Sequence, residues 1–86
     1  MMVYKIIFSD TALKQFGKLE KNFQKRISNS LERIKIRPEN YIKRLVDEPY
    51  YSFRVGDYRL ILDIQKDKMI IFIVILGHRR SIYKNL

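Results

Sequence analysis

The stretch FRVGDYRLIL, residues 53–62, constrains the fold more than any other part of the chain. Its Gly56-Asp57 pair suits the positive-φ positions of a two-residue turn, and apolar residues alternate on both sides of that pair. A two-residue turn fixes the register of a β-hairpin, so Arg54 should lie opposite Arg59. Like charges placed opposite each other destabilise a sheet. We therefore expect this pair of arginines to serve function instead of stability.

The flanking patterns predict an α+β fold. A β-branched stretch, residues 3–8, is followed by a Ser9 helix cap and by two runs of apolar residues at helical spacing, the second of which stops before Pro38. After a connector over residues 38–49 the chain returns as the hairpin and as a third apolar strand over residues 69–76. The expected order is an N-terminal strand, two tandem helices and a three-stranded antiparallel meander, with the helices on one face of the sheet and a short basic C-terminal tail.

The two hairpins of this meander assign side chains to the two faces of the sheet. Along the first hairpin, one alternating set should face the helices and the other should stay open to solvent. The helix-facing set is Tyr51, Phe53, Val55, Tyr58, Leu60 and Leu62, and the open set is Ser52, Arg54, Arg59 and Asp63. A second tight turn at residues 66–67 would place Arg59 opposite Val74. In that register Val74, Leu76 and His78 share the face of the two arginines.

Length, charge and composition limit the classes of function. An 86-residue chain with a net charge of +9 should form a single domain, residues 1–86, and should have a polyanionic partner. The chain has no cysteine and one histidine, so we expect no metal site and no cofactor. Its start lacks the pattern of a signal peptide, and its longest apolar run is too short to span a bilayer. We therefore expect a cytoplasmic protein with no membrane partner.

The C-terminal stretch GHRRSIY, residues 77–83, should emerge beside the arginine hairpin, because the strand before it runs toward the Gly56-Asp57 turn. The residues brought together would be Arg54, Arg59, His78, Arg79, Arg80 and Tyr83. Guanidinium groups match phosphate oxygens and stabilise transition-state charge, and a tyrosine can stack on a base or exchange a proton. This set suits metal-free RNA cleavage, in which the 2'-hydroxyl attacks the phosphate. A patch that only binds RNA would have the same sequence.

The same motifs resemble a known family. YSFRVGDYRLIL, the β-run after it and LGHRRSIYKNL are similar to the C-terminal half of the RelE/ParE superfamily of prokaryotic type II toxin-antitoxin toxins. The hairpin arginine and the basic-aromatic end are closer to the RelE branch of messenger RNA interferases than to the ParE gyrase poisons. The resemblance implies a metal-independent endoribonuclease that cleaves messenger RNA in the ribosomal A site and leaves a 2',3'-cyclic phosphate. It also implies a RelB-like antitoxin as partner, with a heterotetramer as one expected assembly.

The resemblance implies roles for individual residues as well. Arg59 corresponds to the phosphate-stabilising arginine after the turn, and Tyr83 to the terminal tyrosine. The expected catalytic residues are Arg54, Arg59, Arg80 and Tyr83, and the expected RNA-binding residues are Lys43, Arg44, Ser52, His78 and Arg79. Ser52 stands where some members carry a catalytic lysine, and Val46-Asp47 follows Leu45 where a Leu-x-Gly turn is common. This second departure would reshape the connector.

Two other classes of function remain open on the sequence. One is a ParE-like toxin that binds gyrase and cleaves no RNA, and the other is an inactive, basic RNA-binding relative. The basic residues of the two predicted helices, Lys14, Lys18, Lys21, Lys25, Arg26, Arg33 and Lys35, look like solvated helix faces. They could also contact ribosomal RNA through salt-dependent phosphate binding.

Overall fold

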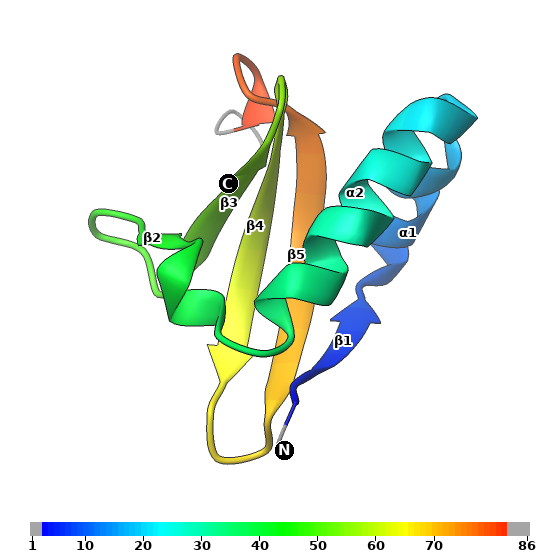
Figure 1. Cartoon of the computed structure of the whole chain (residues 1–86). Helices are drawn as coiled ribbons and strands as arrows, with labels where there is room; N and C mark the ends of the chain where they lie inside the picture. Colours follow the sequence, from blue (N-terminus) through cyan, green and yellow to red (C-terminus); the bar gives the residue numbers. More distant parts are fainter. Residues whose placement is uncertain (1–2, 83–86) are drawn as a thin grey trace.

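The computed structural model describes residues 3–82 (Figure 1). The chain forms a five-stranded sheet in the order β1-β5-β4-β3-β2. The elements are β1 (Lys5–Phe8), α1 (Asp10–Gly17), α2 (Lys21–Ile34), the short 3₁₀ helix η1 (Pro38–Asn40), β2 (Lys43–Arg44), β3 (Tyr51–Val55), β4 (Tyr58–Gln65) and β5 (Ile70–His78). The predicted α+β order is confirmed, and β2 is an edge strand within the predicted connector. No helix within residues 3–82 is long and apolar enough to cross a membrane.

Both helices pack on one face of the sheet, as predicted. Ile27, Leu31 and Ile34 of α2 are buried because they recur at helical spacing, and Ala12 of α1 joins them. These side chains meet the buried residues Phe53, Val55, Leu60, Leu62, Ile71, Ile73 and Leu76 of β3, β4 and β5. The ring of Tyr58 contacts that of Phe23 in α2 edge to face, with 5.3 Å between the ring centroids. The helix-facing side of the first hairpin is therefore the one that the sequence predicts.

The β3–β4 hairpin has the predicted register. Arg54 pairs with Arg59, and Val55 pairs with Tyr58. Gly56 has a φ of 60°, a left-handed conformation that glycine adopts without the steric cost of a side chain. The turn therefore sets one arginine opposite the other, on the face away from the helices.

The β4–β5 hairpin differs from the prediction in two ways. Its turn spans residues 66–69 instead of residues 66–67, which moves the register by two residues and leaves the assignment of faces unchanged. A β-bulge beside Ile61 then leaves Val74 without a pairing partner, so that Arg59 pairs with Gly77 and Tyr58 with His78. The predicted placement of Leu76 and His78 beside the arginines is therefore wrong, because a bulge reverses the faces of the residues that follow it.

Helix α1 satisfies the backbone of β5 beside this bulge. The Ser9 hydroxyl donates a hydrogen bond to the carbonyl oxygen of Val74 at 2.6 Å, and the backbone N–H of Leu76 donates to Oε1 of Gln15 at 2.7 Å. Ser9 is also the predicted helix cap, since its hydroxyl oxygen accepts from the N–H of Ala12 at 3.0 Å. The packing of α1 on the sheet thus supplies hydrogen bonds to the backbone of the bulge.

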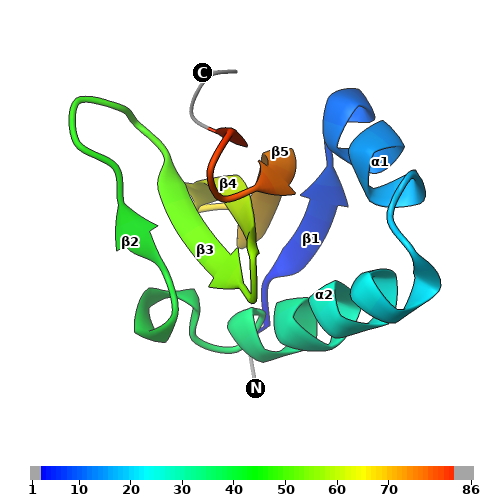
Figure 2. The same ribbon diagram turned by 90° about the horizontal axis from the view of Figure 1, so that it is seen from above.

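The face away from α2 is less open than predicted. The buried residues Ile61, Ile75 and Ile82 form a second cluster, with Leu45, Tyr50 and Val74 packed at its margin. Figure 2 shows the end of the described chain on the opposite side of the sheet from α2. The prediction of a solvent-exposed face fails here because it overlooked the apolar side chains of Ile61 and Ile82, which bury each other against the sheet.

Candidate functional site

Basic residues gather at the end of the sheet where the β3–β4 turn meets the last described residues. Arg54 lies opposite Arg59, and Gly77 lies opposite Arg59 on the next strand. The backbone N–H of Arg79 donates to the carbonyl oxygen of Asp57 at 2.8 Å. This hydrogen bond therefore holds the tail, residues 79–82, against the turn that carries the arginine pair.

Packing anchors the tail a second time. Ile82 is 1% exposed. A Cβ built on Gly77 would lie 3.2 Å from the Cδ1 atom of Ile82. The glycine thus allows the tail to approach β5 closely. Between the two anchors the N–H of Ser81 donates to the carbonyl oxygen of His78 at 3.0 Å, which closes a tight turn. Arg80 projects from this turn and is exposed.

The predicted site residues differ in their access to solvent. The exposed ones are Lys43, Arg44, Arg54, His78 and Arg80, and the half-buried ones are Arg59 and Arg79. Ser52 is only 8% exposed, so its hydroxyl offers little surface to a macromolecular ligand. Tyr83, the fourth expected catalytic residue, lies outside the described residues.

His78 lies on the helix side of the sheet end, away from the arginine face. It pairs with Tyr58, and the two rings meet edge to face with 6.1 Å between their centroids. Its Nδ1 atom accepts a hydrogen bond from the backbone N–H of Arg80 at 3.4 Å. His78 therefore helps to shape the turn that presents Arg80.

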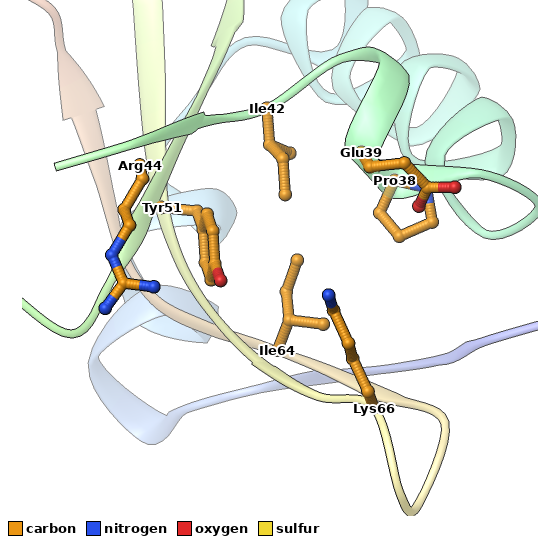
Figure 3. A pocket seen from close by; sticks show the side chains of 7 residues that line it. All are labelled: Pro38, Glu39, Ile42, Arg44, Tyr51, Ile64 and Lys66. Atoms are coloured by element: carbon orange, nitrogen blue, oxygen red, sulfur yellow. The ribbon is translucent and has the colours of Figure 1, made fainter.

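Arg44 is separated from the other predicted RNA-binding residues. Lys43 pairs with Ser52 and Arg44 pairs with Tyr51, so the two basic side chains of β2 point to opposite faces. Cζ of Arg44 lies 5.7 Å from the centroid of the Tyr51 ring, a cation–π contact. Both residues line a pocket of about 150 Å³ together with Pro38, Glu39, Ile42, Ile64 and Lys66 (Figure 3). The pocket lies at the end of β3 opposite to the Gly56 turn.

The connector loop before β3 contains one residue with a left-handed backbone conformation. Asp47 stands where the resemblance leads one to expect glycine, and its φ of 61° is left-handed. Aspartate tolerates this conformation better than most residues with a side chain. The loop is closed by the Leu45 N–H, which donates to the carbonyl oxygen of Tyr50 at 3.0 Å. The aspartate thus adopts the type of conformation that a glycine would supply.

A second pocket, of about 410 Å³, lies on the helix side of the β3–β4 turn. It is lined by Arg26, Asn29, Ser30 and Arg33 of α2 and by Arg54, Val55 and Gly56 of the hairpin. From the sequence, Arg26 and Arg33 are expected to be solvated residues of a helix. Their separation by seven positions, with polar residues three and four positions after the first, is the signal that places all of them on one helix face.

The chemistry of this sheet end is that of guanidinium groups. Among residues 3–82, no group of three or more His, Cys, Asp or Glu side chains could hold a metal ion. Arginine presents N–H donors in a planar fork that matches two oxygens of a phosphate or carboxylate. The arrangement can therefore bind an oxyanion and stabilise negative charge that develops on it.

Comparison with known proteins assigns the chain to a class and then to a family. The fold is that of the RelE/ParE superfamily of toxins. The sequence profile of the ParE toxin of the type II toxin-antitoxin system, parDE, matches residues 6–83. This chain therefore belongs to the ParE toxin family of type II toxin-antitoxin systems. A search of curated protein sequences gave no match.

Solved structures of RelE toxins share the fold. The RelBE2 toxin-antitoxin complex of Mycobacterium tuberculosis contains a chain of 25% identity and TM-score 0.82, with 90% of this chain and 99% of that chain covered. The RelB-RelE antitoxin-toxin complex of Methanococcus jannaschii contains one of 26% identity and TM-score 0.68, with 93% and 98% covered. A mutant of the Escherichia coli toxin RelE in the free state has 22% identity and TM-score 0.80, with 98% and 93% covered; at this identity the likeness concerns the fold alone.

Proposed function

We propose that this protein is a ribosome-dependent endoribonuclease toxin, which cleaves messenger RNA in the A site and so inhibits translation. The observation that carries the proposal is the meeting of Arg54 and Arg59 with the tail that bears Arg79 and Arg80. The likeness of the sequence motifs to the RelE branch and of the fold to RelE structures supports this assignment.

The proposed reaction uses the RNA's own nucleophile. The 2'-oxygen forms a bond to phosphorus and gives up its proton, while the bond from phosphorus to the 5'-oxygen breaks and that oxygen takes up a proton. The products are a 2',3'-cyclic phosphate and a 5'-hydroxyl. Arg59 would stabilise the charge on the phosphate oxygens, since fixed guanidinium donors act most strongly where charge develops. Arg54 and Arg80 would hold the flanking RNA, and Tyr83 would stack on a base or transfer a proton.

We also infer that a RelB-like antitoxin neutralises the protein. The similar chains from Mycobacterium tuberculosis and Methanococcus jannaschii were solved in complexes with antitoxins. A net charge of +9 favours an acidic segment that covers the basic sheet end. Assembly of two toxins with two antitoxins would account for a heterotetramer, and action on ribosomes implies a location in the cytoplasm.

A ParE-like action on gyrase is the second candidate function. The observation that favours it is the matching profile itself, which is that of ParE toxins. A gyrase poison would cause DNA-damage signalling and would leave messenger RNA intact. An inactive RNA-binding relative would do neither, and its expression would not inhibit growth.

The experiment that tests the proposal maps RNA 5' ends by primer extension after antitoxin-free protein is added to programmed ribosomes. Naked RNA and the Arg59→Ala variant serve as controls, and Lys68→Ala removes one charge at an exposed turn far from the site. New ends at the A-site codon, formed only with ribosomes and lost only in Arg59→Ala, would support the nuclease. If the folded protein forms no new ends with or without ribosomes, the nuclease proposal is wrong and gyrase becomes the target to examine.

A further inference from the structure

The pocket behind the β3–β4 turn contains three arginines from two separate elements. Arg26 and Arg33 come from α2 and Arg54 from β3. The buried residues Ile27, Leu31 and Ile34 of α2 lie on the neighbouring stripe, roughly a third of a turn around the helix. Because burial of that stripe fixes the rotation of the helix, the polar stripe has to face the hairpin. The convergence of the three cations is thus set by the packing of α2.

The turn backbone lies directly against one of these cations. A Cβ built on Gly56 would lie 3.2 Å from both Cζ and Nη1 of Arg26. A side chain at position 56 would therefore push the guanidinium away from the turn. On the other side, Nε of Arg54 donates to the carbonyl oxygen of Gly56 at 3.0 Å. The small turn residue is what allows both guanidinium groups to border the same space.

The donors around this space have no acidic counterpart within it. Among the described residues, no carboxylate lines the pocket, and the other polar side chains are Asn29 and Ser30. Three like charges repel one another unless an anion joins them. The donor set of three guanidinium groups, an amide and a hydroxyl is suited to a phosphate group.

We propose that this pocket binds a phosphate of the RNA backbone and is a second RNA contact beside the cleavage site. The inference takes its ligand from the proposed function. RNA is favoured over an acidic protein segment because Val55 is the only apolar side chain among the lining residues that the structure describes. Protein segments bind mainly through apolar anchors, whereas phosphate contacts require only charge and hydrogen-bond donors.

Arg54 connects the two parts of this RNA surface. It lies opposite Arg59 in the hairpin and also lines the pocket with Arg26 and Arg33. A strand that passes over the turn would meet Arg59 on one side of the sheet and the pocket on the other. The pocket would then hold the RNA in register while Arg59 contacts the reacting phosphate.

The test measures binding of a short fluorescent single-stranded RNA in which every 2'-hydroxyl is methylated, so that no cleavage occurs. The variant is Arg26→Ala/Arg33→Ala, and the matched control is Lys21→Ala/Lys25→Ala, which removes the same charge from exposed positions of the same helix. Binding is followed by fluorescence anisotropy from low to high salt. Urea unfolding shows whether each variant keeps its fold.

We expect the arginine variant to bind the RNA roughly tenfold more weakly than the control variant does at low salt. The slope of the logarithm of the association constant against the logarithm of the salt concentration should become less steep by about 0.7, because one phosphate contact is lost. Equal losses in the two variants would overturn the inference in favour of diffuse charge attraction. The inference would also be overturned if the wild-type protein did not bind this RNA at low salt. The same holds if the arginine variant lost binding of the antitoxin and kept binding of the RNA.

The test separates this inference from the proposed function. If wild-type protein cleaves messenger RNA on ribosomes and the arginine variant binds methylated RNA like the control, the pocket inference alone is wrong. If no cleavage occurs and the arginine variant still loses RNA binding, the nuclease proposal is wrong and the pocket stands as an RNA-binding site.

Discussion

Ile82 packs on Gly77 so closely that a Cβ on the glycine would lie 3.2 Å from Cδ1 of the isoleucine. Gly77 is also the residue that pairs with Arg59. The close contact therefore holds the tail against the strand next to the arginine face. Arg79 donates the backbone bond to Asp57, and Arg80 lies between that bond and the Ile82 contact, so apolar packing and a backbone bond together position the two arginines.

The first prediction concerns this apolar anchor. Ile82→Ala should lower the free energy of unfolding by about 2 kcal/mol, because it removes a fully buried side chain from a small cluster. It should also slow RNA cleavage, since Arg80 would lose its fixed position. Urea unfolding and primer extension measure the two effects. The control is Val46→Ala, which truncates a side chain that is 86% exposed; similar results for both variants would show that the tail is not held by Ile82.

The second prediction separates stability from function in the hairpin. Arg54→Glu should raise the free energy of unfolding by about 0.5 kcal/mol, because it replaces a repulsive cross-strand pair with an attractive one. The same change should abolish cleavage, since a carboxylate repels the phosphate. Lys68→Glu makes the same change of charge at the distant turn and should leave cleavage intact. A stable Arg54→Glu variant with full activity would remove Arg54 from the site.

The arginine pair could be predicted from the sequence because its cause is local. The Gly56-Asp57 turn fixes the register over the few residues on each side of it, and no other part of the chain is needed. The helix-facing residues could be predicted for the same reason, since alternation along a strand needs only one buried residue to set both faces.

The β-bulge could not be predicted in this way because its cause is distant in sequence. Val74 is left out of the pairing, and the atoms that hold its neighbourhood belong to Ser9 and Gln15 of the α1 region. The assignment of His78 depended on that register and failed with it. Arg26 and Arg33 were missed for a related reason, since a polar helix face becomes a pocket only when the hairpin packs beside it.

The third prediction concerns the β4–β5 turn. Met69 has a φ of 55°, a left-handed conformation that costs a residue with a side chain about 1–2 kcal/mol. Met69→Gly should therefore raise the free energy of unfolding by about 0.5 kcal/mol, after the entropy of the added glycine is counted. The control is Lys68→Gly, which has no positive φ to relieve and should lower stability. Thermal and urea unfolding measure the stability of the two variants. A loss of stability in both variants would contradict the prediction.

The fourth prediction concerns the residue that joins helix α1 to the bulge. Ser9→Ala removes the helix cap, which is worth about 1 kcal/mol, and leaves the Val74 carbonyl without its donor, which costs about 1 kcal/mol more. Thr11→Ala, at an exposed position of the same helical turn, should cost less than about 0.5 kcal/mol. Urea unfolding measures both losses.

Amide exchange distinguishes loss of the cap from loss of the bulge. The N–H of Leu76 is bound by Gln15 of the same helix at 2.7 Å, so its exchange reports on the contact between α1 and β5. Faster exchange at Leu76 in Ser9→Ala, with normal exchange in Thr11→Ala, is expected if Ser9 holds the bulge. Unchanged exchange at Leu76, with faster exchange confined to the first turn of α1, would show that Ser9 acts only as a cap. In that case the register that places Gly77 beside Arg59 would be maintained by the strands themselves.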